Sequence, residues 1–274
     1  MVFSIRIVAA LVHMLAFASV DPVVVDVINK RFVDGSASNN LTAAGVLLHQ
    51  GFGAKEAWLP SPGKLSDRVP AILTNKRLSE KAGRVNIFSS RGGFVLAPSE
   101  TDVLCSYPGD GGTDDRICDR GARPQCIPGC ECRDTLPQPC NNWCSRERPE
   151  RWQDCAYPPA QLKDMLERFE GDMRTSYNEV VVGTADWRVP AVIEAVFFIS
   201  EGGLLVAACA TCDAACKEAR AVRERLLQRF AVPPARVPLL CLDPGKIHEG
   251  PFADVSGMAP ASVVEDMMGK IVFA

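Results

Sequence analysis

Cysteine is the residue type with the most chemistry to offer in this chain of 274 residues, which carries twelve of them. Cysteine thiols form disulfides, ligate metals or act as redox nucleophiles, depending on compartment and spacing. The twelve fall into two groups, and each group is even in number, as closed sets of disulfides require. We predict that all of them form disulfides and leave the pairing open. The first group is Cys105, Cys118, Cys126, Cys130, Cys132, Cys140, Cys144 and Cys155, and the second is Cys209, Cys212, Cys216 and Cys241.

The spacing within the first group does not favour a metal site. Residues 126–132 read C-x3-C-x-C and residues 140–144 read C-x3-C, whereas structural zinc sites use paired CxxC units, often with histidine. His49 and His248 are both far from this stretch in sequence. In an oxidising compartment such thiols pair with one another. We expect disulfides here, with no metal and no cofactor.

The first twenty residues predict that compartment. Residues 1–6 carry one positive charge, residues 7–20 are almost wholly apolar, and Ala16-Phe17-Ala18 has the small residues that a signal peptidase accepts. The apolar run is shorter than the roughly 20 residues that cross a bilayer. Residues 1–20 are therefore predicted to be a signal peptide of a secreted or cell-surface protein, with no transmembrane span left after cleavage. The net charge of −3 and the lack of a basic run exclude a nucleic-acid partner.

The second group of cysteines allows a redox interpretation. An apolar run precedes Cys209-Ala-Thr-Cys212, and a helix is predicted after it, which resembles the order of a thioredoxin-like site. That chemistry needs a thiolate at a helix N-terminus, where the helix dipole lowers the thiol pKa. Asp213 carries a negative charge that disfavours a thiolate at Cys212, and Cys216 and Cys241 could be structural partners for both cysteines. Structural bridges are our first interpretation, and a thiol–disulfide oxidoreductase using Cys209 and Cys212 is an alternative.

One acidic residue lies inside an otherwise apolar segment. Tyr177-Asn178-Glu179 is followed by three valines, and the alternation of a strand places Tyr177, Glu179 and Val181 on one face. A glutamate at this position lies either at the open rim of a sheet or in a cleft. His49 and Asp186 could complete an acid–base set with Glu179, although no spacing demands it.

The Tyr-Asn-Glu strand resembles the last catalytic motif of ADP-ribosyltransferases of the poly(ADP-ribose)-polymerase type. Residues 44–52 resemble the helix and turn that follow the first motif, and residues 93–97 resemble the second motif. However, no His-Gly precedes residue 44, and Val95 stands where that family has a tyrosine. The resemblance implies NAD as substrate, with Glu179 holding a ribose hydroxyl and stabilising an oxocarbenium-like transition state. Glu179 and Tyr177 are the candidate catalytic residues of this alternative, which also includes an inactive relative.

A broader resemblance covers most of the chain in order. The segments SNNLTAAGVL, SSRGGFVLAP, CAYPP, YNEVVV and IEAVFF look like those of a group of secreted, Cys-rich proteins of unicellular algae. The resemblance implies a compartment and an architecture and no activity. Asn40-Leu41-Thr42 adds a glycosylation sequon in a segment that reads as an exposed loop.

Apolar periodicity predicts the elements that position these residues. A helix should begin at Pro22 and bury Val24, Val27, Ile28 and Phe32. Two further helices should bury Leu162, Met165, Leu166 and Phe169, and then, after a cap at Asp213, Ala219, Val222, Leu226 and Phe230. Strands are predicted at 94–97, 177–182, 192–199 and 237–242, the second and third as neighbours, and residues 45–48 suit either a strand or a buried turn. Loops are predicted at 58–70 and 105–155, and a last helix and strand at 262–268 and 271–273.

These elements predict an α+β fold with a mixed or antiparallel sheet and flanking helices. Residues 21–104 and 156–274 should form one globular domain, and residues 105–155 a disulfide-stapled insertion with little regular structure. The sequence thus predicts a secreted or cell-surface, disulfide-stabilised protein that binds an unknown extracellular ligand or has a structural role. Whether it is an enzyme stays open.

Overall fold

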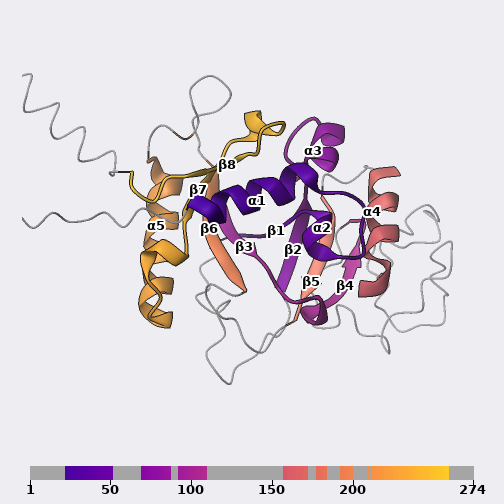
Figure 1. The fold of residues 1–274 in the computed structure, drawn as a ribbon, viewed down its shortest axis with the longest axis horizontal. Coiled ribbons are helices and arrows are strands. Elements are labelled where there is room, and N and C mark those ends of the chain that lie inside the picture. Colours follow the sequence, from indigo (N-terminus) through magenta and orange to yellow (C-terminus); the bar gives the residue numbers. More distant parts are fainter. Residues whose placement is uncertain are drawn as a thin grey trace, which may run out of the picture.

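The computed structural model describes residues 22–51, 69–87, 92–109, 157–171, 177–183, 192–199, 209 and 212–258. Within these ranges the protein is α+β, as predicted, with helices on both faces of a mixed sheet of eight strands (Figure 1). The predicted signal peptide, most of the predicted insertion, and the predicted elements at 262–268 and 271–273 lie outside the described residues.

The sheet has the strand order β4-β5-β2-β1-β3-β6-β7-β8. Every neighbouring pair is antiparallel except β6 and β7, which are parallel and are joined through helix α5. Parallel neighbours need such a crossover, whereas antiparallel strands can be joined by short turns. The strands are β1 (Val46–Gln50), β2 (Val69–Thr74), β3 (Gly92–Leu96), β4 (Val103–Tyr107), β5 (Glu179–Val182), β6 (Ile193–Ile199), β7 (Leu239–Leu242) and β8 (Phe252–Asp254).

Three expectations about the strands were wrong. The strands β5 and β6 are not neighbours, because β2, β1 and β3 lie between them. Strand β2 begins at Val69, inside the segment predicted as loop, and β4 extends to Tyr107, inside the start of the predicted insertion. Strand β2 contains Pro70, and β4 contains a cysteine within the predicted disulfide-rich stretch. Because of these residues, the composition of both segments indicated loops rather than strands.

One face of the sheet is covered by helix α1 (Pro22–Asp34). Its buried residues Val25, Ile28 and Phe32 follow helical spacing and pack against Val46, Leu48 and other residues of the sheet. Val27, which was expected to face inward, is 46% exposed. The helix was therefore predicted correctly, and its buried face is rotated toward Val25.

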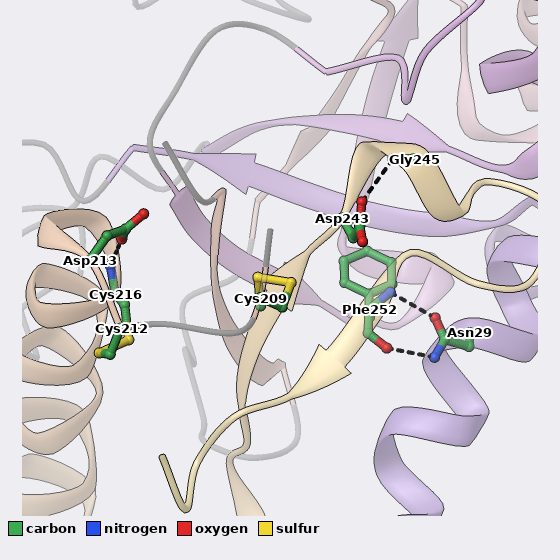
Figure 2. Close-up of a disulfide and its surroundings, with 9 residues drawn as sticks. Asn29, Cys209, Cys212, Asp213, Cys216, Asp243, Gly245 and Phe252 are labelled. Carbon is green, nitrogen blue, oxygen red and sulfur yellow. Dashed lines mark hydrogen bonds between the residues drawn. A yellow bond between two sulfur atoms is a disulfide. The ribbon is translucent and has the colours of Figure 1, made fainter. Parts of the chain in front are cut away.

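The same helix protects the edge of the sheet at β8. The side chain of Asn29 donates to the carbonyl of Phe252 (2.8 Å) and accepts from its N–H (3.0 Å), as Figure 2 shows. An edge strand otherwise exposes such groups to another chain. Gly250 precedes this contact with φ of +108°, and a Cβ there would lie 2.6 Å from Asn29, so both backbone angle and space require glycine.

The opposite face is covered by α4 (Leu162–Gly171) and α5 (Ala214–Phe230), with the short helices α2 (Leu41–Ala44) and α3 (Lys76–Ala82) contributing residues to the same core. The four residues predicted to form the inner face of α4 are all buried. In α5 the predicted Ala219, Val222 and Leu226 are buried, and Phe230 is half-buried. None of the helices in the described part of the chain is long and apolar enough to span a membrane.

Candidate functional site

The second group of cysteines meets around the first turn of α5. Asp213 is the N-cap of this helix, and its carboxylate accepts the backbone N–H of Cys216 at 2.9 Å. Cys212 precedes the cap and is bonded to Cys216, with 5.0 Å between their Cα atoms. Figure 2 shows the bridge directly beside the cap. The covalent bond and the cap thus hold the same helical turn.

A second bridge fixes the chain before α5 to the sheet. Cys209 is bonded to Cys241 in the middle of β7, and their Cα atoms are 5.7 Å apart. Cys241 is fully buried, whereas Cys209 is half-buried. This bridge spans 32 positions of sequence, against four for the bridge between Cys212 and Cys216. It closes a loop that contains the whole of α5.

The two candidate redox cysteines therefore belong to different bridges. A CxxC redox centre needs its two cysteines to share one disulfide, whereas Cys209 and Cys212 are bonded to Cys241 and Cys216. Cys212 is 1% exposed, and the nearby Arg220 donates mainly to the carbonyl of Met258 (2.6 Å) and only distantly to the Cys212 sulfur (3.9 Å). In the oxidised form that the structure shows, both cysteine pairs act as structural cross-links. Cys105 is also disulfide-bonded, and the other seven cysteines of the first group lie outside the described residues.

Glu179 lies at the start of β5, opposite Tyr107 of β4. It is 5% exposed and Tyr107 is fully buried. Tyr107 forms a small apolar cluster with Cys105 and Val181, the residue two positions after Glu179 on the same face of β5. Tyr177, the other residue of the candidate motif, precedes the strand and is half-buried. The predicted alternation is thus present, and it points Glu179 into a packed part of the sheet.

His49 is on the other face of the sheet. It follows Leu47 with strand alternation, and Leu47 belongs to the core beneath α4 and α5, together with Val180 and Val182 of β5. Glu179 therefore has its side chain on the opposite side of the backbone layer from His49, which rules out a direct acid–base pair between them. Asp186 lies outside the described residues.

Burial and a hydrogen bond act in opposite directions on the pKa of His49. The ring is 4% exposed and lies parallel to that of Phe94, with 6.3 Å between centroids. Its Nδ1 is 2.6 Å from the carbonyl oxygen of Pro70, which can only accept, so Nδ1 carries a hydrogen. Burial lowers the pKa of His49, and the hydrogen bond to Pro70 partly opposes that shift. Burial thus favours the neutral form of the imidazole.

Asn178, which sequence reasoning treated only as part of the motif, has a clear structural role. Its amide oxygen accepts the N–H of Leu73 (2.9 Å) and its amide nitrogen donates to the carbonyl of the same residue (2.9 Å). Asn86 also donates to that carbonyl (3.1 Å) and accepts from the hydroxyl of Thr74 (2.7 Å). The side chain of Asn178 thus continues the ladder of β2 and β5 where the strand pairing ends. In the sequence, the position of this polar residue beside an apolar run could have indicated a buried structural role.

Comparison of the chain with protein-family models, curated proteins and solved structures found no match. Within the described residues, no three or more histidine, cysteine, aspartate or glutamate side chains come together as a group that could hold a metal ion. The disulfides are therefore the best-defined chemical feature of the described structure.

Proposed function

We propose that this is a secreted or cell-surface protein that binds an extracellular ligand or has an extracellular structural role on a disulfide-stabilised scaffold. The observation that carries the proposal is the pair of bridges around α5, because three of their four cysteines are almost completely buried. Disulfides of this kind form and persist in oxidising compartments and are rare in the cytosol. The predicted signal peptide supports the same compartment.

The state of the candidate catalytic residues supports binding over catalysis. Glu179 is buried on one face of the sheet, beside Tyr107 of the neighbouring strand, and His49 lies on the other face. Cys209 and Cys212 each form a bridge with a different partner. These four residues thus have packing or cross-linking roles in the described structure.

Expression of the full chain with its own leader in a eukaryotic secretory host tests the proposal. We expect the protein in the medium, cleaved after the leader, with no cysteine modified by a thiol-alkylating reagent under denaturing conditions. Retention in the cytosol with reactive thiols would overturn the proposal. If only Cys209 and Cys212 become reactive under mild reductant and the protein then reduces a model disulfide, the oxidoreductase alternative replaces it.

The transferase alternative has its own test. Wild type and Glu179→Gln are incubated with NAD, and nicotinamide release is measured. The binding proposal predicts no release by either protein. Release by the wild type that is lost in the variant would establish the ADP-ribosyltransferase alternative and overturn the binding role.

A further inference from the structure

We propose that Asn40 is an N-glycosylation site whose glycan is compatible with the fold because the amide group of Asn40 is already oriented for it. The sequon is Asn40-Leu41-Thr42, in which Leu41 is buried and the two functional residues are exposed. Sequons of this kind are modified in the secretory pathway, so the inference rests on the proposed secreted location. The structural argument concerns the two ends of the Asn40 side chain.

The oxygen end of the amide supports a helix. Asn40 is the N-cap of α2, and its Oδ1 accepts the backbone N–H of Ala43 at 2.9 Å. An N-cap acceptor of this kind satisfies a backbone N–H that has no partner within the helix. The oxygen therefore points toward the fold, and its role needs only a carbonyl oxygen.

The nitrogen end points to the surface. Nδ2 donates to Oε1 of Glu100 at 2.5 Å, and both residues are exposed. Glu100 begins the short 3-10 helix Glu100–Asp102, which precedes β4. Because N-glycans are attached to Nδ2, the atom to be modified is the one that faces away from the helix cap.

The transfer reaction leaves both structural roles possible. Nδ2 attacks C1 of the first sugar of a lipid-linked oligosaccharide, the bond from C1 to the lipid pyrophosphate breaks, and one of the two amide protons is lost. The product keeps the amide carbonyl for the cap and keeps one N–H that can still donate to Glu100. No oxidation or reduction is involved.

Hydrogen bonds of the two residues before Asn40 fix the position of the sequon on the surface. The hydroxyl of Ser38 accepts the N–H of Asn40 at 3.1 Å, and Oδ1 of Asn39 accepts the N–H of Lys163 in the first turn of α4 at 2.8 Å. The glycan would therefore leave the surface beside the starts of α2 and α4. Its attachment should leave the packing of both helices unchanged.

The test uses the mature chain behind a heterologous secretory leader in a eukaryotic host, together with the chain behind its own leader. We expect a glycan on Asn40 that peptide N-glycosidase removes, as measured by peptide mass spectrometry. Thr42→Ala should abolish the modification, and the matched Thr42→Ser should keep it, while both retain Asn40 as the cap. Secreted wild type with unmodified Asn40 would overturn the inference. Failure of the natural leader alone would count only against the proposed function.

A second measurement tests the orientation argument. The glycosidase converts Asn40 to Asp, which keeps an oxygen acceptor for Ala43 but loses the amide nitrogen. We expect the same urea midpoint for the glycosylated protein and for Thr42→Ala, which both keep the amide, and a lower midpoint after the treatment and for Asn40→Asp, because a carboxylate then faces Glu100 in place of an N–H donor. A lower midpoint in the glycosylated protein than in Thr42→Ala would show that the glycan disturbs the cap, which would overturn the claim that the fold accommodates it.

Discussion

The two ends of the sheet are held together in different ways. At the β6–β7–β8 end, one disulfide joins β7 to the chain before α5, another closes the first turn of α5, and α1 protects the edge of β8 through Asn29. At the β4–β5–β2 end, Cys105 of β4 is also disulfide-bonded, but the links that the structure describes between the strands are made by buried polar side chains. Asn178 bonds both backbone groups of Leu73, and Asn86, which follows α3, donates to the carbonyl of the same residue.

The comparison separates two sources of stability. A disulfide stabilises mainly by restricting the unfolded chain, and its contribution grows with the length of the loop that it closes. A buried hydrogen bond acts in the folded state, and its loss costs the desolvation of any partner left unsatisfied. Reductant should therefore remove the stability that the disulfides contribute. The stability contributed by the buried hydrogen bonds should change only when one of their side chains is mutated.

The largest effect is expected for the double variant Cys209→Ala/Cys241→Ala. The bridge closes a loop with a sequence separation of 32, for which chain entropy gives a loss of about 4 kcal/mol in the free energy of unfolding. Urea denaturation under non-reducing conditions measures it. A loss no greater than that of Cys212→Ala/Cys216→Ala would contradict the dependence on loop length.

The next effect concerns the other end of the sheet. Asn178→Ala removes the acceptor of the buried Leu73 N–H, whereas the Leu73 carbonyl keeps Asn86. We expect a loss of about 2–3 kcal/mol, which should be the same in oxidising and reducing buffer. Asn39→Ala is the matched control, since it removes an exposed acceptor and should cost about 1 kcal/mol or less. Equal losses in the two variants would show that Asn178 is not a structural link.

The bridge of α5 should contribute less than the longer one. Cys212→Ala/Cys216→Ala opens a loop with a separation of only four, and we expect a loss of about 2 kcal/mol. The Asp213 cap should still start the helix in this variant. Circular dichroism should therefore show unchanged helix content at low urea, and a large loss of helix would mean that the bridge, not the cap, defines the first turn.

The smallest effect is a pH dependence at the centre of the sheet. Because burial lowers the pKa of His49 in the folded protein, the unfolded chain binds more protons below about pH 6.5. Stability should then fall as the pH falls below that value, by at most about 1.4 kcal/mol per pH unit from this residue. Urea midpoints between pH 7 and pH 5 measure the slope, which should be shallower in His49→Leu. An unchanged slope in the variant would assign the acid sensitivity to other groups.

The elements that sequence predicted best are those with a local pattern. The inner face of α4 and most of the inner face of α5 follow from apolar residues at helical spacing, and Asp213 was correctly identified as a cap. Strand β3 was predicted because a short apolar run after two glycines and a following proline mark it. Strands β2 and β8 had no such pattern, since β2 contains Pro70 and β8 has three residues.

The candidate site was less predictable because it depends on contacts between distant parts of the chain. The Tyr-Asn-Glu segment indicated a strand with Glu179 and Val181 on one face, which the structure contains. That Glu179 would lie opposite Tyr107, and on the other side of the sheet from His49, depends on which strands pair. Strand pairing joins residues far apart in sequence, and the sequence of a buried strand does not indicate which strand it pairs with.

The sequence by itself thus determined the α+β class, the helical faces and the presence of enough cysteines for a closed set of disulfides. Only the tertiary structure decided that β5 lies between β4 and β2, that Cys209 pairs with Cys241 rather than Cys212, and that Asn178 completes a strand ladder. The physical reason is the separation in sequence over which each kind of interaction acts. Periodicity and capping act over a few neighbouring residues, whereas strand order and disulfide pairing are set by the packing of the whole core.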